Sequence, residues 1–116
     1  GIIRVWDAES FQFEKALEGH SQGVLTLGLS GVTKLISGCA DGSIRIWDTT
    51  TWQCENIIDA GDDCHVYSVA CFEDKMFSTS GDGKILVWSM DTWECDRELQ
   101  GHGIWGETEE ATIHQI

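Results

Sequence analysis

The sequence predicts an all-β protein built from four-stranded repeat units. Three observations support this prediction: tryptophans that recur every 41 residues, two Asp-Gly dipeptides, and short segments of alternating or β-branched residues. Trp6, Trp47 and Trp88 share this spacing and have similar neighbours. A repeat of about 40–45 residues with Gly-His and Trp-Asp signatures corresponds to four strands. No segment has the periodicity of an amphipathic helix, so we expect β-sheets alone.

The strands of the first complete repeat follow from short apolar segments that Gly or Asp-Gly residues separate. We expect them at residues 24–29, 34–37, 43–47 and 53–58. Asp41-Gly42 and Asp82-Gly83 predict tight hairpin turns, because glycine accepts the positive φ that such turns require. The preceding hairpin turns at Ser30-Gly31 and at Glu73-Asp74, where the second repeat is one residue shorter.

More residues match in the same register. Gly19-His20 returns as Gly101-His102, and residues 37–42 match residues 78–83. Together with the Trp-Asp dipeptides, these matches make the chain resemble the WD40-repeat β-propeller family over residues 1 to about 102. In addition, the short hairpin at 71–78 is similar to that of F-box/WD-type receptors. The resemblance implies the outer two strands of a preceding blade at 1–18, WD40 repeats at 19–59 and 60–100, and the start of a further repeat or a divergent C-terminal tail at 101–116.

WD40 blades resemble one another in a hydrogen-bonded structural tetrad. The first complete repeat carries a full set: His20, Ser37, Asp41 and Trp47. A buried indole N–H needs an acceptor, which the serine can supply; the serine can donate to the imidazole, and the imidazole to the carboxylate. The second repeat carries a partial set: Ser78, Asp82 and Trp88. Gly61 stands where its histidine belongs, and Asp62, Asp63 and His65 are out of register. We predict a structural network and no catalytic triad.

The resemblance also implies where a partner would bind. In such blades, contacts on the top face come from the start of the innermost strand and from the residue before the turn aspartate. The candidate partner-binding residues are His65, Tyr67, Trp105 and Leu25. Aromatic side chains dominate interface hot spots, which favours His65, Tyr67 and Trp105. The alternative, that Tyr67 and Trp105 only pack within the fold, stays open.

The charge balance excludes some classes of partner. Lys and Arg total 7 against 20 Asp and Glu, which gives a formal net charge of −13. We expect no nucleic-acid or anionic-membrane binding, because phosphates require a clustered positive field. No apolar run reaches the about 18 residues of a membrane span. Five cysteines without a C-x-x-C pair predict free thiols in a reducing compartment, hence an intracellular and cytoplasmic protein, with the nucleus left open.

No catalytic motif is recognisable in the chain. Residues 81–84 lack the ending of a phosphate-binding loop, and the histidines and cysteines lack metal-ligand spacing. We therefore expect no enzyme activity, no cofactor and no metal. The leading interpretation is a protein-protein interaction scaffold that docks a protein or peptide on the top face of the propeller. The alternatives are a structural subunit of a large assembly and, less favoured, a ligase substrate receptor or an enzyme.

The predicted blades do not complete a propeller. Closure takes about four to eight blades, whereas this chain supplies two and part of a third. Two apolar faces and open sheet edges would therefore be bare. Three explanations stay open: part of a larger propeller, self-association into an oligomeric ring, and a free-standing monomer. We favour the first, because the chain starts within a blade and lacks an initiator Met.

Overall fold

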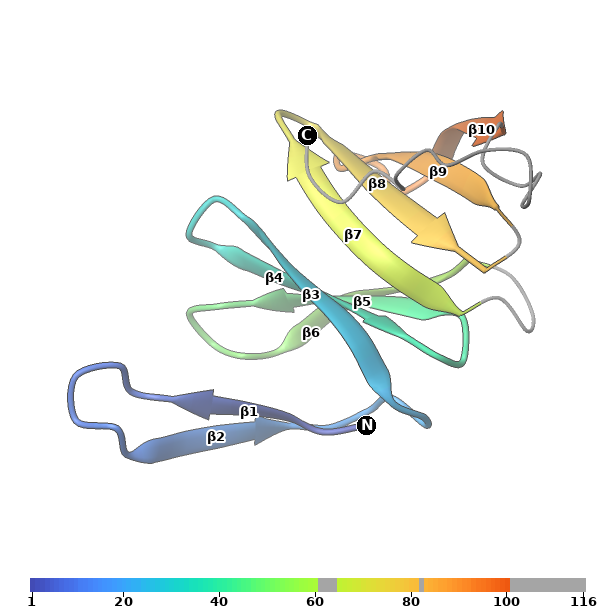
Figure 1. The fold of residues 1–116 in the computed structure, drawn as a ribbon. Helices are drawn as coiled ribbons and strands as arrows, with labels where there is room; N and C mark the ends of the chain where they lie inside the picture. The colour runs from blue at the N-terminus through green and yellow to red at the C-terminus, as the bar shows by residue number, and fades with distance from the viewer. Residues whose placement is uncertain (61–64, 82, 101–116) are drawn as a thin grey trace.

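Three antiparallel sheets lie side by side in the computed structural model, which describes residues 1–60, 65–81 and 83–100 (Figure 1). The first sheet pairs β1 (Ile3–Trp6) with β2 (Phe13–Leu17). The middle sheet contains β3 (Val24–Ser30), β4 (Lys34–Cys39), β5 (Ser43–Asp48) and β6 (Cys54–Asp59). The last sheet contains β7 (Val66–Phe72), β8 (Lys75–Ser80), β9 (Lys84–Ser89) and β10 (Cys95–Gln100). The prediction of an all-β fold with four-stranded antiparallel sheets is confirmed.

Within these ranges, no helix occurs that could cross a membrane.

The strands run in chain order across each four-stranded sheet, so every connection is a hairpin. Their bounds differ from the expected ones by one or two residues. β4 continues through Gly38 and Cys39, because Gly38 pairs with both Thr26 and Ile44 and Cys39 pairs with Val24. Backbone pairing thus extends the strand into a glycine that local sequence would assign to a turn.

The middle and last sheets share one hydrophobic core. Its buried residues are Ile36, Ile44, Ile46, Ile58, Val66, Val69, Met76, Leu86 and Trp88. Two glycines permit the close approach of the sheets. A Cβ on Gly28 would lie 3.0 Å from Val69 Cγ2, and a Cβ on Gly38 would lie 2.6 Å from Val66 Cγ1. β3 and β7 are therefore neighbouring strands of adjacent sheets, as Figure 1 shows.

A second core joins the first sheet to the middle one. The indole of Trp47 is buried there with Ile3 of β1 and Leu17 of β2. Trp47 is therefore held between two sheets, with its ring carbons in apolar surroundings and its N–H toward the interior of its own sheet. Burial of such a large ring fixes the position of everything that hydrogen-bonds to it.

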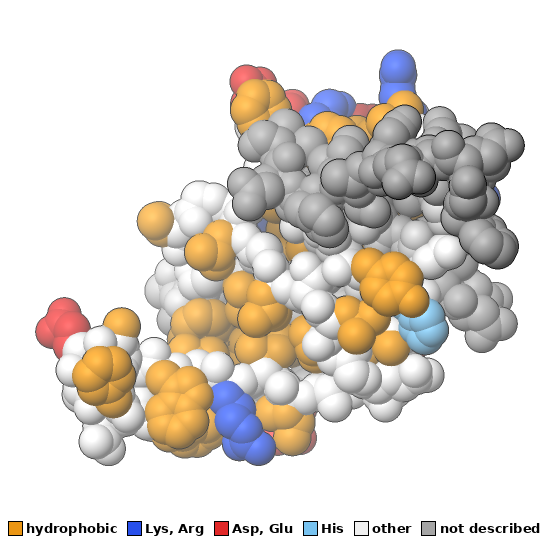
Figure 2. Space-filling view, viewed as in Figure 1, with side chains coloured by type: hydrophobic (Ala, Val, Ile, Leu, Met, Phe, Trp, Pro, Cys, Tyr) orange, Lys and Arg blue, Asp and Glu red, His pale blue; other side chains and the backbone are white. Residues whose placement is uncertain are grey.

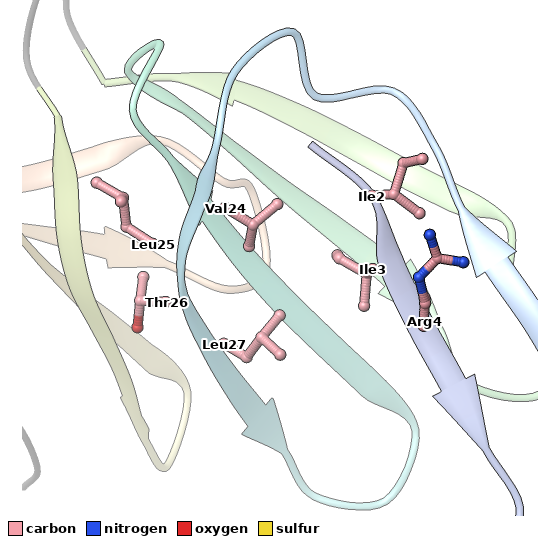
Figure 3. A pocket seen from close by; sticks show the side chains of 7 residues that line it. All are labelled: Ile2, Ile3, Arg4, Val24, Leu25, Thr26 and Leu27. Carbon is pink, nitrogen blue, oxygen red and sulfur yellow. The ribbon is translucent and has the colours of Figure 1, made fainter.

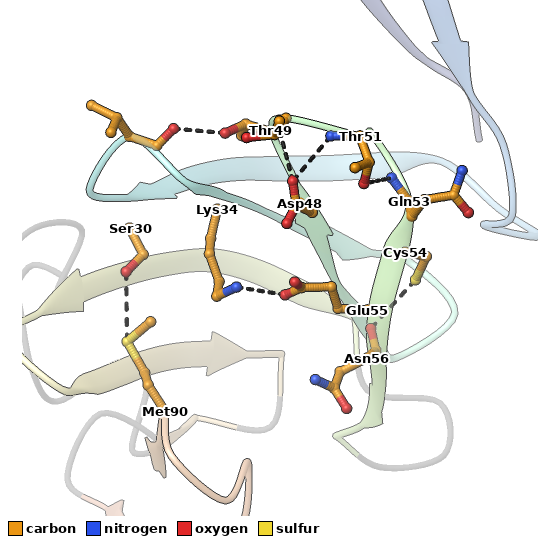
Figure 4. Close-up of polar contacts among 12 residues, drawn as sticks. Ser30, Lys34, Asp48, Thr49, Thr51, Gln53, Cys54, Glu55, Asn56 and Met90 are labelled. Carbon is orange, nitrogen blue, oxygen red and sulfur yellow. Dashed lines mark hydrogen bonds and ion pairs between the residues drawn. The ribbon is translucent and has the colours of Figure 1, made fainter.

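The aspartate of each Trp-Asp dipeptide forms a turn. The Asp48 carboxylate accepts the backbone N–H groups of Thr50 and Thr51, at 2.7 and 3.0 Å. Figure 4 shows the bond to Thr51. Trp52 then adopts a left-handed φ of 60°, and its N–H donates to the Asp48 carbonyl at 2.7 Å. Phe11 and Trp93 have the same conformation, with φ of 58°. The 41-residue repeat therefore reproduces a backbone conformation that side chains seldom adopt.

Candidate functional site

A buried hydrogen-bond network links the four candidate tetrad residues of the middle sheet. Ser37, on β4, is fully buried and accepts a hydrogen bond from the Trp47 indole N–H at 2.9 Å. Its hydroxyl lies 2.6 Å from His20 Nε2, and the other ring nitrogen lies 3.1 Å from Ser43 Oγ. Ser43 Oγ donates to Asp41 Oδ1 at 2.6 Å. Hydrogen bonds therefore run from the tryptophan to the aspartate without a break.

Ser43 is the residue that the sequence analysis missed. We expected His20 to donate directly to Asp41, but the Ser43 hydroxyl lies between them. The reason is local, because the Asp41 carboxylate turns back onto the hairpin and also accepts the Ser43 backbone N–H at 2.8 Å. The internal repeat gives no signal for this role, because Lys84 stands at the matching position of the second repeat.

The network changes the proton affinity of both of its titratable groups. Desolvation by burial lowers the pKa of His20 below its ordinary 6.5, and the charge of Arg45 lowers it further. Burial alone would raise the pKa of Asp41, but hydrogen bonds from Ser43, Ser21 and Cys39 outweigh burial and leave the pKa well below its ordinary value. The folded protein therefore favours a neutral imidazole and an ionised carboxylate, as a structural relay requires.

The described residues of the last sheet repeat the first link of this network. Trp88 donates its indole N–H to Ser78 Oγ at 3.0 Å, in the same geometry as Trp47 and Ser37. Asp82 and the candidate replacements Asp62 and Asp63 lie outside the described residues. His65 does not enter the network: its Nδ1–H donates to the Ala40 carbonyl at 2.7 Å and so bridges the last sheet to the middle one.

Two candidate partner-binding residues occupy β-bulges at the loop end of the innermost strands. We use "loop end" for the end of the sheets that carries the Asp41-Gly42 turn. In β3 the register shifts between Val24 and Thr26, and in β7 it shifts between Val66 and Ser68. Leu25 and Tyr67 are the extra residues, and a bulge turns such a side chain outward. They are 44% and 53% exposed.

Tyr67 and His65 form an exposed ring pair at this end. Their ring centroids lie 5.8 Å apart, with an interplanar angle of 50°. Gly81 leaves room for the tyrosine, because a Cβ there would lie 3.2 Å from Tyr67 Cε2. Trp105, the remaining candidate, lies outside the described residues. We call Leu25, His65 and Tyr67 the loop-end residues.

Comparison with known proteins decides the family. A sequence model described as WD domain, G-beta repeat matches residues 11–48 and 52–89. The chain belongs to the WD40 family. Its fold is similar to a solved structure of U3-55K, with a TM-score of 0.80 and 26% identity over 87% of this chain and 33% of the other.

The crystal structure of RRP9 WD40 repeats is similar to the same extent, with a TM-score of 0.79 and 27% identity, covering 87% of this chain and 33% of that one. This WD40 chain therefore spans about a third of the length of the solved structures it matches. A comparison with curated protein sequences found no match. The predicted membership of the WD40 family is confirmed.

One face of the middle WD40 sheet is open along β3, beyond the part that the first sheet covers. Leu27 in β3 pairs with Ser37, and Val69 in β7 pairs with Ser78, so the two occupy the same position in successive blades. Leu27 is 52% exposed, whereas Val69 is 6% exposed because the middle sheet covers it. Figure 2 shows hydrophobic side chains gathered on the face where β3 runs.

A groove separates β3 from β1 on this open face. Its volume is about 380 Å³, and Figure 3 shows the seven residues that line it: Ile2, Ile3, Arg4, Val24, Leu25, Thr26 and Leu27. Among the described residues, β1 pairs only with β2, so its other edge faces this groove. The groove therefore has an apolar wall of side chains and a free backbone edge, which suits additional β-strands.

Proposed function

We propose that this WD40 chain is a scaffold that docks another protein or peptide at its loop end, with Tyr67 as the main contact. WD40 proteins generally bind other proteins. The observation that supports this site is the exposed Tyr67 ring, which projects from a bulge in a strand whose neighbours Val66 and Val69 are buried. A ring on such a rigid support offers a large contact area with little loss of conformational entropy.

The polar surroundings of Tyr67 suit recognition of a peptide backbone or a polar side chain. His65 is anchored through Nδ1 to the Ala40 carbonyl, so its ring is held in place beside Tyr67. The tyrosine hydroxyl adds a donor and an acceptor to an apolar ring, and its ring packs over Gly81. An aromatic centre with oriented polar groups around it is the usual composition of an interface core and rim.

The charge and the thiols support the remaining parts of the proposal. A net charge of −13 makes nucleic acid and anionic membranes poor partners. Cys39, Cys54, Cys71 and Cys95 are free thiols, which is consistent with an intracellular, cytoplasmic or nuclear, location. Each hydrogen bond of the described network ends on another buried or turn residue, which supports a structural role for the network. We therefore propose a non-enzymatic role.

A second candidate function is that of a structural subunit. The open face of β3 supports it, because the groove beside β1 can accept strands from another polypeptide or from a second copy of this chain. In this alternative, binding would depend on Leu27 and not on Tyr67. The two functions therefore make binding depend on different residues, Tyr67 in the first and Leu27 in the second.

Site-specific photo-cross-linking distinguishes these candidates. Benzoylphenylalanine in place of Tyr67 would identify partners, and binding would then be repeated with the purified partner. The same group in place of Ile57, an exposed residue on the outer strand β6, is the matched control. We expect cross-links from position 67 and none from position 57. Cross-links from position 57, or cross-links that form only when the same group replaces Leu27, would refute docking at the loop end.

A further inference from the structure

Three side chains that form no metal-binding motif in the sequence, two of them tetrad residues, converge in the middle sheet. His20 precedes β3, Cys39 ends β4, and Asp41 lies in the turn that follows. Each offers one ligand atom, and these atoms all lie within 4.8 Å of one another. His20 and Cys39 are buried, and Asp41 is half-buried. Cys39 is not a tetrad residue, so the structural network does not explain its presence here.

The three residues of this cluster are linked by hydrogen bonds. The Cys39 sulfur accepts the Asp41 backbone N–H at 3.4 Å, and His20 Nδ1 lies 3.1 Å from the Ser43 hydroxyl, which donates to Asp41 Oδ1 at 2.6 Å. Binding of a divalent cation would release the thiol proton to solvent. The Nδ1 proton would move to Nε2, which lies 2.6 Å from Ser37 Oγ and could donate to it. One proton is therefore released for each cation bound.

The charge of the resulting site is balanced. A divalent cation with one thiolate, one carboxylate and one neutral imidazole has no net charge, which keeps the desolvation penalty of a buried ion small. Thiolate and imidazole are ligands of zinc and similar transition metals, whereas calcium and magnesium prefer oxygen. The Ser37 hydroxyl would accept the other imidazole N–H, the arrangement that orients most metal-binding histidines.

We propose that His20, Cys39 and Asp41 form a binding site for a divalent transition metal, with zinc as the expected occupant. The Ser43 hydroxyl or a water molecule completes a tetrahedral set. Asp41 is the entry side, because its other carboxylate oxygen bonds the exposed Ser21 hydroxyl at 2.7 Å. The second repeat has Gly61, Ser80 and Asp82 at the matching positions, so its sequence retains one of the three ligands.

Cobalt is the probe for this site, because a thiolate bound to Co²⁺ gives a charge-transfer absorption band. The full chain of 116 residues is titrated with Co²⁺ alone, and Zn²⁺ should then displace it. We expect the band in the wild type and in the control Cys71→Ser, whose half-buried thiol on β7 lies outside the cluster. Cys39→Ser should abolish the band. This substitution places serine where the second repeat already has Ser80, so the fold should accept it.

Thiol alkylation of the wild-type protein gives a second, independent readout. With free zinc at about ten times its dissociation constant, mass action predicts about tenfold slower alkylation of Cys39 and no change at Cys71. Absence of the cobalt band in the wild type, or its persistence in Cys39→Ser, would overturn the proposal. Equal alkylation of Cys39 with and without zinc would overturn it as well, even if Cys39→Ser failed to fold.

Discussion

Ser37 is the residue on which the buried network of the middle blade depends. Its hydroxyl is fully buried and contacts two rings at once, Trp47 at 2.9 Å and His20 at 2.6 Å. A serine oxygen can accept one hydrogen bond and donate another, so this position satisfies both rings. Loss of either neighbour would remove one of the two hydrogen bonds of this buried hydroxyl, which is costly.

Trp47→Phe tests this dependence. The substitution keeps much of the ring volume but removes the N–H that donates to Ser37, so we expect a loss of about 1–3 kcal/mol in the free energy of unfolding. Trp88→Phe should lose less, because Gly61 replaces the histidine of that network. Denaturant unfolding of both variants gives the comparison. Equal losses would mean that the histidine contributes nothing.

The lowered pKa of His20 predicts that acid destabilises the fold. The unfolded histidine binds a proton near its ordinary pKa of 6.5, whereas the folded one resists protonation. The contribution of His20 to the free energy of unfolding is therefore complete above about pH 6.5 and decreases as the pH falls below this value. Asp41, whose pKa is also lowered, adds a second loss as the pH falls below its ordinary 3.8.

Unfolding free energies of the wild type and of His20→Gln, measured between about pH 7.5 and 5, separate the contribution of His20 from that of the other histidines. We expect wild-type stability to fall across this interval, and His20→Gln to show a smaller dependence from a lower starting value. A wild-type stability that stays constant across the interval would contradict the neutral, buried state of His20.

The sequence could identify side chains at this scale but not all of their contacts. Repetition of Trp47 and Trp88, with a serine ten residues before each, marks the buried pairs because both copies need the same acceptor. Ser43 and Cys39 have no such repetition, since lysine and serine replace them in the second repeat. Their roles arise only when the hairpin turn brings Asp41 beside His20.

At the scale of strands, the contact between blades depends on a glycine. Gly38 of β4 faces Val66 of β7 and Thr26 of its own sheet, at distances that leave no room for a methyl group. The hairpin turns and strand order could be predicted from the Asp-Gly dipeptides and the repeat. The bulges at Leu25 and Tyr67 could not, because a bulge is defined by the pairing with the neighbouring strand, which the residues of one strand do not specify.

Gly38→Ala should separate the two blades. Its Cβ would lie 2.6 Å from Val66 Cγ1 and 2.7 Å from Thr26 Cγ2, so we expect a loss of about 1–3 kcal/mol in unfolding free energy. Gly23→Ala is the control, because an added Cβ there has nothing within 4 Å. Val66→Ala should lower the unfolding free energy less in the Gly38→Ala variant than it does in the wild type. Wild-type stability in Gly38→Ala would refute the close approach.

At the scale of the molecule, the open face of β3 predicts self-association of the isolated chain. Leu27 is 52% exposed where its counterpart Val69 is buried, and the groove beside it ends at the free edge of β1. We expect sedimentation to give the mass of two or more chains. Leu27→Lys should shift this mass toward the monomer, and Ile57→Lys, on the exposed outer strand β6, should not. A compact wild-type monomer that unfolds cooperatively would contradict this prediction.

Docking at the loop end is the central claim, and calorimetry with a purified cross-linked partner tests it most directly. We predict that Tyr67→Ala weakens binding by about 2 kcal/mol or more, which corresponds to about 30-fold in Kd, at both low and high salt. Ile57→Ala, which removes an equally exposed apolar side chain from β6, should change binding by less than about 0.5 kcal/mol. Unchanged unfolding midpoints would show that both variants remain folded. Wild-type affinity in a folded Tyr67→Ala variant would contradict the claim.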